Sequence, residues 1–165
     1  QFGNAYGIDP APVLAEYPAS DYPTPAAAFA TLVSEVGFQC PTRRFVRAMA
    51  AQSNPAYLYH WVYEPDFDFL GDLGAFHSAD VAYVFGTPIL GLVDLTPEEA
   101  PLVDTMTGYW SAFARTGDPA DGGAPSWPAY AEASDEHLEI DLGTVAVDSG
   151  LRKDKCDFWD TQLPQ

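Results

Sequence analysis

Hydrophobic residues recur every three or four positions in several stretches of the chain, which is the spacing of amphipathic helices. The clearest stretch covers residues 97–115. Thr96 is expected to cap this helix, Glu99 to complete a capping box, and Gly117 to end the helix. The pattern therefore predicts one long helix with both ends defined by the sequence.

Four further helices are expected from the same spacing. A short one covers about residues 11–16, and another begins at Thr24 and Pro25, which suit an N-cap and a first helical position. Gly37 is expected to end this second helix as a C-cap glycine. A third covers about residues 41–52, and a last one begins near Ser149.

Strand-like patterns are fewer. Residues 56–63 are almost continuously apolar and aromatic, which favours a strand of a mostly parallel sheet buried on both faces. Residues 138–142 alternate apolar and acidic side chains, which predicts a half-exposed edge strand, with residues 144–147 as a hairpin arm. So few strands indicate either a small α+β domain or a sheet whose other strands lie upstream.

Composition sets limits on function. The 165 residues are 47% hydrophobic, enough for one domain with a core, and carry a formal charge of −17. Such a charge disfavours binding to nucleic acid and to anionic membrane surfaces. It indicates solubility or, if the acids are focused in a cleft, attraction of a cationic substrate.

No stretch approaches the length of a membrane span. The chain begins at Gln1 without a recognisable signal peptide, so we expect the gene product to begin upstream. The two cysteines, Cys40 and Cys156, are either free buried thiols or one disulfide that closes a loop of 116 positions.

Complete catalytic signatures are absent from the sequence. It contains no G-x-S-x-G elbow, P-loop, H-E-x-x-H or C-x-x-C pattern. Residues 66–71 resemble a calcium loop only in part, because Leu70 and His77 occupy ligand positions. The motifs therefore identify neither a metal site nor a cofactor site.

The three histidines are predicted to differ in role. His60 lies inside a strand and is expected to be a hydrogen-bonded structural residue, while His137 is expected to be solvated. His77 ends a long loop that follows a buried strand, where a neutral imidazole suits a general base. The alternatives are a structural loop histidine, or a metal ligand beside Asp80 that lacks a third partner.

The segment around His77 resembles a known family. Residues 74–80 read GAFHSAD and VFG follows at 84–86, which is similar to the catalytic-histidine segment of type-B carboxylesterases, the family that includes the cholinesterases. That segment usually reads G-x-x-H-G-x-E. Further landmarks follow in the family's order: FQCP at 38–41, YLY at 57–59, YWSAFARTGDP at 109–119, WPAY at 127–130 and CDFW at 156–159.

The resemblance implies an α/β fold, namely the C-terminal part of an α/β-hydrolase fold, with the last strands of a mostly parallel sheet and flanking helices. Residues 1–165 would be one segment of a single domain, incomplete on its own. His77 would be the base of a catalytic triad, and Cys40 and Cys156 would form a disulfide. Asp80 would stand where a supporting glutamate steadies the triad. Ser78 for glycine and Asp80 for glutamate depart from the family pattern.

The family's nucleophilic serine, oxyanion glycines and acidic triad member all precede this segment, and none has a counterpart here. The resemblance thus implies a secreted, periplasmic or extracellular serine esterase that acts on a small-molecule ester and needs the missing N-terminal part of the same protein. The isolated chain is expected to be inactive. The alternatives are a non-enzymatic, cholinesterase-like adhesion or binding domain and an independent small acidic domain.

Overall fold

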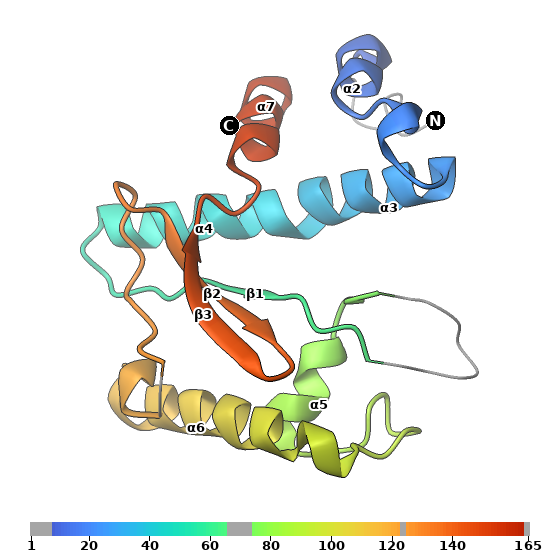
Figure 1. The fold of residues 1–165 in the computed structure, drawn as a ribbon. Helices are drawn as coiled ribbons and strands as arrows, with labels where there is room; N and C mark the ends of the chain where they lie inside the picture. Colours follow the sequence, from blue (N-terminus) through green and yellow to red (C-terminus); the bar gives the residue numbers. More distant parts are fainter. Residues whose placement is uncertain (1–7, 66–73, 123–124, 164–165) are drawn as a thin grey trace. The chain divides into compact units, whose positions relative to one another are not determined.

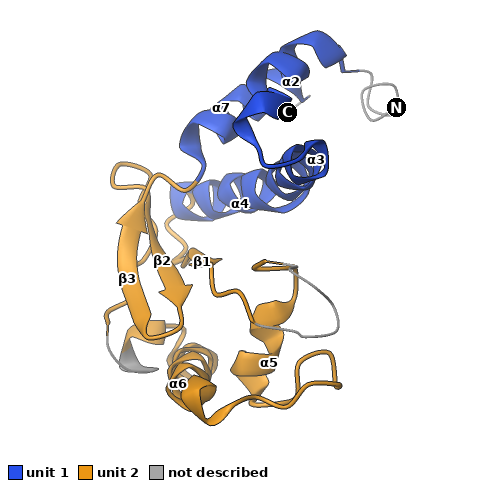
Figure 2. Cartoon of the chain, turned by 45° about the vertical axis from the view of Figure 1, so that its right-hand side comes forward, with its two compact units in different colours: residues 1–51, 152–165 blue, residues 52–151 orange. Residues whose placement is uncertain are grey.

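The computed structural model describes residues 8–65, 74–122 and 125–163, and their contacts divide the chain into two compact units (Figures 1 and 2). Unit 1 combines Gln1–Ala51 with Arg152–Gln165, and unit 2 is Gln52–Leu151. Each unit has its own hydrophobic core. The two units are described separately below.

Unit 1 is helical. The short helix α2 (Pro10–Glu16) confirms the first prediction, and Asp9 caps it by accepting a hydrogen bond from the Ala11 N–H at 3.0 Å. Thr24 caps helix α3 (Pro25–Ser34) by accepting from the Ala27 N–H at 3.0 Å, also as expected. The remaining elements are the 3₁₀ turn η1 (Ala19–Asp21), helix α4 (Cys40–Ala51) and helix α7 (Lys153–Gln162).

The prediction that Gly37 ends a helix is wrong. Gly37 lies inside a π-helical turn, η2 (Glu35–Gln39), which connects α3 directly to α4. A π turn inserts an extra residue without breaking the helix, so no left-handed cap is needed. Burial of Glu35 within this turn shows that tertiary packing outweighs the local preference of glycine for a helix end.

The core of unit 1 joins its N-terminal and C-terminal segments. Cys40 and Cys156 form the expected disulfide, with 5.1 Å between their Cα atoms. A loop of 116 residues makes such a bond worth roughly 4–5 kcal/mol in the chain-entropy model. Beside it, the Trp159 indole N–H donates to the Tyr17 hydroxyl at 2.7 Å, and this hydroxyl donates to the buried Glu35 carboxylate.

Unit 2 contains a three-stranded mixed sheet. Strand β1 (Tyr59–Trp61) pairs in parallel with β2 (Glu136–Asp141), and β2 pairs antiparallel with β3 (Thr144–Ser149). The hairpin prediction is confirmed, but the strand predicted at an edge is the central one. Alternating apolar and acidic residues fit this position because the sheet buries one face more completely than the other.

Two other boundaries differ from expectation. Strand β1 is shorter than the apolar run at 56–63, and all three of its residues are only half-buried. The last helix begins at Lys153 rather than near Ser149, because β3 continues to Ser149 and Gly150 follows with a positive φ of 74°. The partial calcium-loop pattern at 66–71 lies outside the described residues.

The helices of unit 2 match the strongest sequence signals. The 3₁₀ turn η3 (Pro97–Glu99) leads into helix α6 (Ala100–Thr116), and Gly117 ends it with φ of 77°. The Glu99 carboxylate accepts from the Thr96 N–H at 2.6 Å, which confirms the expected capping box. The first two residues of the VFG run at 84–86 end helix α5 (Ala79–Phe85), Gly86 caps this helix, and η4 (Pro119–Gly122) follows α6.

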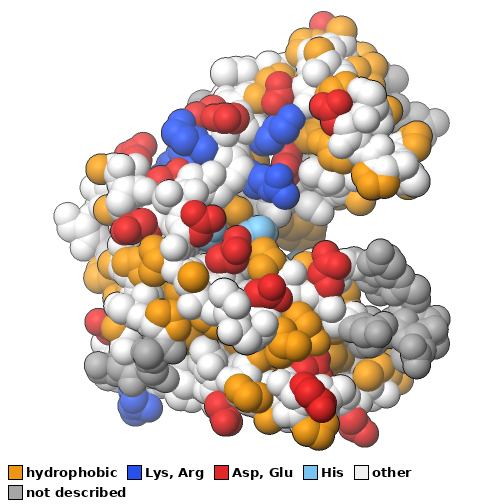
Figure 3. All heavy atoms as spheres, in the orientation of Figure 1, with side chains coloured by type: hydrophobic (Ala, Val, Ile, Leu, Met, Phe, Trp, Pro, Cys, Tyr) orange, Lys and Arg blue, Asp and Glu red, His pale blue; other side chains and the backbone are white. Residues whose placement is uncertain are grey.

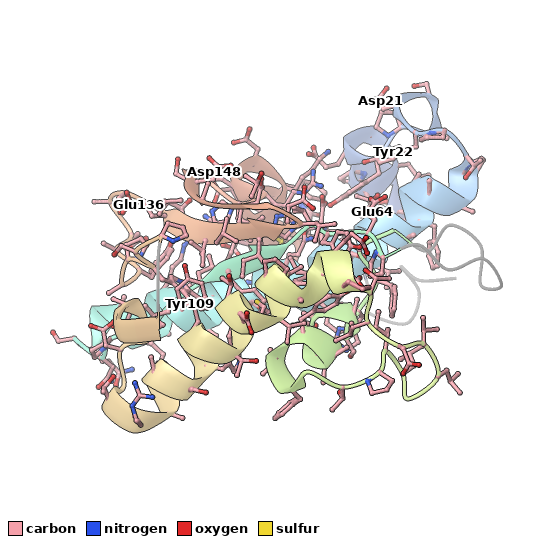
Figure 4. All side chains as sticks on the ribbon, turned by 60° about the horizontal axis from the view of Figure 1, so that its bottom comes forward. Asp21, Tyr22, Glu64, Tyr109, Glu136 and Asp148 are labelled. Carbon is pink, nitrogen blue, oxygen red and sulfur yellow. A yellow bond between two sulfur atoms is a disulfide. The ribbon has the colours of Figure 1, made fainter. Side chains whose placement is uncertain are left out.

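Trp127 connects the loop after η4 to the sheet. Its indole N–H donates to the Leu58 carbonyl at 3.0 Å, just before β1. Its ring lies edge-on to Tyr59 and to Tyr109 of α6, with centroids 5.7 and 5.5 Å away; Tyr109 is labelled in Figure 4. Leu138 and Ile140 of β2 complete this core with no exposed surface.

Glu99 is a buried carboxylate, 4% exposed, with three donors. It accepts hydrogen bonds from the hydroxyls of Tyr63 (3.1 Å) and Tyr83 (2.5 Å) as well as from the Thr96 backbone. Burial acts to raise the pKa of Glu99, but the hydrogen bonds outweigh it and the pKa lies below its usual value. Burial and the bond to Glu99 in turn raise the pKa of Tyr63 to about 12.

Acidic side chains lie scattered over the face of the molecule seen in Figure 3. Along the described residues, no helix combines the length and the apolar content needed to cross a bilayer.

The Glu99 cluster predicts how stability depends on pH. Since the folded-state pKa is lowered, the carboxylate stabilises the fold above its unfolded pKa, and this stabilisation is lost as the pH falls through the folded value. Glu99→Gln should lower the free energy of unfolding at pH 7 by about 1–3 kcal/mol and flatten its decline at acid pH. Chemical unfolding at several pH values measures the free energy of unfolding and its decline at acid pH.

The control is Glu98→Gln at the exposed neighbouring residue, which should change stability by less than about 0.5 kcal/mol. Equal acid slopes for wild type and Glu99→Gln would contradict the prediction.

Candidate active site

His77 lies in a tight turn directly before helix α5 and is exposed. Gly74 opens the turn with φ of 60°, and the Phe76 N–H donates to the Gly74 carbonyl at 2.9 Å. The Ala79 N–H then donates to the Phe76 carbonyl at 3.1 Å, which leads the chain into the helix. These backbone bonds hold the peptide on both sides of His77, and its side chain is exposed at the surface of unit 2.

The residue after His77 has a strained backbone. Ser78 is in the left-handed region, with φ of 72° and ψ of 6°. A side chain with a Cβ atom adopts this region at a cost of roughly 1–2 kcal/mol, whereas glycine adopts it freely. The geometry gives a physical reason why glycine suits this position and makes Ser78 a costly departure.

Asp80, in the first turn of α5, is connected to the sheet. Its carboxylate accepts a hydrogen bond from the Tyr59 hydroxyl at 2.6 Å, which joins α5 to β1. Burial, and then this hydrogen bond, raise the pKa of Tyr59 well above its usual range, so the phenol stays protonated and donates. The shorter aspartate side chain therefore has a direct protein partner on β1.

The other two histidines lie together on the sheet. His60 and His137 have ring centroids 6.2 Å apart, and the Nδ1 atom of His60 is 3.9 Å from a carboxylate oxygen of Glu139. The prediction that His137 is solvated is wrong, because its side chain on the central strand β2 is only 2% exposed. His60 lies inside β1 as predicted, but it is half-buried, whereas this strand was expected to be buried on both faces.

The group of His60, His137 and Glu139 was missed by sequence reasoning. No local motif contains all three residues, because His60 lies 77 positions before His137 and 79 before Glu139 in the chain. A signal was nevertheless present, since parallel pairing of the two apolar runs would bring His60 next to this acidic and histidine-containing strand.

A small aromatic hollow of about 170 Å³ lies elsewhere in unit 2. Its lining is almost entirely apolar, and His77 is not part of it. The hollow is lined by Tyr57, Tyr59, Tyr109, Trp110, Phe113, Pro119 and Trp127. Tyr59 joins the two places, because its ring lines the hollow while its hydroxyl binds Asp80. This hollow can accept an apolar group but offers no base or nucleophile of its own.

The strain at Ser78 leads to a stability prediction. Ser78→Gly should raise the free energy of unfolding by about 1 kcal/mol, because glycine removes the cost of the left-handed conformation. Ser111→Gly is the matched control. Ser111 is exposed within α6, so the same replacement there should lower stability by about 0.5 kcal/mol. Thermal unfolding of the two variants tests this, and the same sign of change in both would contradict it.

Comparisons with known proteins identify the family of the chain. The model of the carboxylesterase family matches residues 11–159. Carboxylesterase 5A of Canis lupus familiaris is 36% identical over 149 residues, which are 82% of this chain and 25% of the relative. Carboxylesterase 3 of Pongo abelii is 32% identical over 156 residues, covering 88% of this chain and 27% of the relative.

Acetylcholinesterase of Bungarus fasciatus is 29% identical over 138 residues, which are 81% of this chain and 23% of the relative. The chain thus spans about a quarter of the length of these curated relatives. The family match covers nearly the whole sequence and includes His77, Asp80 and both cysteines. The chain belongs to the carboxylesterase family.

Proposed function

We propose that this chain is the C-terminal segment of a serine carboxylic ester hydrolase and supplies its catalytic base, His77. Membership of the carboxylesterase family supports ester hydrolysis as the reaction. The observation that carries the assignment of the base is the exposed imidazole of His77, held in a backbone-bonded turn at the start of α5. No cofactor and no metal ion is needed for this reaction.

The proposed reaction uses a serine from the upstream part of the protein. His77 takes the serine proton as the serine oxygen attacks the ester carbonyl, and then gives that proton to the departing alkoxide. The acyl-enzyme that remains is attacked by a water molecule, whose proton passes to His77 and then to the serine as the carboxylic acid leaves. The substrate class is a small-molecule ester.

The same proposal makes residues 1–165 part of one α/β-hydrolase domain whose remainder is the N-terminal part of the same protein. The length comparison supports this, because about three quarters of each relative lies outside the matched region. The sheet supports it too: among the strands of the described residues, β1 is at the end of the order β1-β2-β3, so its outer edge can pair with a further strand. An upstream strand at this edge would extend the sheet.

We further propose that the protein is secreted, extracellular or periplasmic. The Cys40–Cys156 disulfide supports this location, because such bonds form and persist in oxidising compartments.

Replacement of the base tests the proposed reaction. In the full-length gene product, His77→Gln should lower kcat for a short p-nitrophenyl ester by at least about ten thousand-fold with little change in KM, since the triad acts as a unit. Leu92→Gln introduces the same side chain at a position that is 74% exposed, and it should retain activity. The isolated 165-residue chain should show no hydrolysis, because it lacks the nucleophile.

Two results would overturn this proposal. Hydrolysis by the isolated chain that disappears in His77→Gln would show that no upstream serine is needed. A full-length protein without a G-x-S-x-G serine, or without reaction with a fluorophosphonate probe, would instead support a non-enzymatic binding domain.

Asp80 is proposed to position the His77 turn through its hydrogen bond to Tyr59. Asp80→Ala and Tyr59→Phe remove the same bond from opposite sides, so each should lower kcat by about tenfold, and the double variant should fall no further. Steady-state kinetics of the full-length protein measures this cycle. Independent, multiplicative losses would show that Asp80 does not act through Tyr59.

A further inference from the structure

We propose that His60, His137 and Glu139 form a binding site for a divalent transition-metal ion, for which zinc is the best-suited probe. The three residues each offer one ligand atom, and these atoms all lie within 4.8 Å of one another. The proposal concerns β1 and β2 alone and does not depend on the proposed esterase function.

The strand register brings the three side chains together. His60 is the direct partner of Glu139 in the parallel pair of β1 and β2. His137 precedes Glu139 by two positions, so both side chains point to the same face of β2. The neighbouring pairs Tyr59–Leu138 and Trp61–Ile140 point to the opposite face, which packs into the core of unit 2. The possible ligands thus occupy one face of the sheet and the apolar residues the other.

The distances are close to those of a metal site. A zinc ion bound to nitrogen and oxygen at about 2.1 Å holds its tetrahedral ligand atoms about 3.4 Å apart. The His60 Nδ1 atom and a Glu139 oxygen are already 3.9 Å apart. The ligand atoms, at most 4.8 Å apart, therefore have to approach one another by up to about 1.4 Å, which rotation of the partly exposed His60 and Glu139 side chains can supply.

The three possible ligands differ in burial: His137 is buried, while His60 and Glu139 are partly exposed. His137 is 2% exposed and so has little freedom to move. The side chains of His60 and Glu139 are 22% and 43% exposed, which leaves a path for an ion from solvent. Two imidazoles and one carboxylate are a donor set that zinc accepts, with a fourth position left for water.

Electrostatics favours a cation at this place. Unit 2 contains 17 acidic residues and one basic residue, Arg115, which is a formal charge of −16 out of −17 for the whole chain. The antiparallel register also pairs His137 with Asp148 of β3, which is labelled in Figure 4. A divalent cation here would reduce the repulsion between the Glu139 and Asp148 carboxylates. A histidine side chain next to a carboxylate reduces such repulsion only when the histidine is protonated.

The test is zinc binding by the full-length protein at pH 7.5, with inorganic zinc as the only ligand. Titration against a competing chromophoric chelator should reveal a site that Glu139→Gln and His60→Asn each weaken by at least about tenfold. Because both substitutions are at partly exposed positions, we expect the fold to be retained, which far-ultraviolet circular dichroism checks.

Matched controls are available for both substitutions. Glu136→Gln changes the same residue type as Glu139→Gln, on the same strand but on the other face. His77→Asn is the control for His60→Asn, because His77 lies in the turn before α5 and not on the sheet. Both control variants should bind zinc at this site as the wild type does. Glu136 is labelled in Figure 4 at the start of β2.

A second measurement needs no variant. Anomalous scattering at the zinc edge from wild-type crystals soaked in zinc should place a peak between the three side chains. Absence of that peak at millimolar zinc, or equal zinc affinity of the wild type, Glu139→Gln and His60→Asn, would overturn the proposal and leave His60 and Glu139 as a plain polar pair. A peak together with weakened binding in both variants would establish the site.

Discussion

The parallel pairing of β1 with β2 is the constraint on which the rest of unit 2 depends. Two short strands more than 70 residues apart in sequence share one register, and the segment between them has to return along the sheet as a crossover that contains α5 and α6. The same register places Tyr59 on the core face and His60 on the other. One set of backbone hydrogen bonds therefore positions both the anchor of Asp80 and the partner of Glu139.

Much of the fold follows from local chemistry that is visible in the sequence. Thr96, Glu99 and Gly117 mark the two ends of the long helical stretch because caps act through neighbouring backbone groups, and the structure has these caps. The prediction at Gly37 failed because it rested on the glycine alone. Whether the helix continues there depends on packing around the buried Glu35, which is not a local property of the sequence. The disulfide was implied by resemblance to a family, while the spacing of the cysteines left free thiols equally open.

In the candidate active site, too, the features made by contiguous residues could be predicted and those made by distant residues could not. The segment around His77 and the departures from the family pattern at Ser78 and Asp80 could be identified from the sequence, because these residues are close together in the chain. Three other features depend on the order of the strands in the sheet. These are the hydrogen bond between Tyr59 and Asp80, the burial of His137, and the pairing of His60 with Glu139. Such pairings join distant parts of the chain, so the periodicity of hydrophobic residues along the sequence does not predict them.

The uneven distribution of charge has a consequence for how the two units respond to their surroundings. Six of the seven basic residues belong to unit 1, where Arg44 lies 2.5 Å from Asp160 and Lys155 lies 3.0 Å from Glu16. Added salt weakens such attractions, whereas in unit 2 it mainly screens repulsion between carboxylates. Ionic strength therefore acts on the two units in opposite directions. Added salt leaves unit 1 more dependent on its Cys40–Cys156 disulfide, whereas it relieves charge repulsion in unit 2.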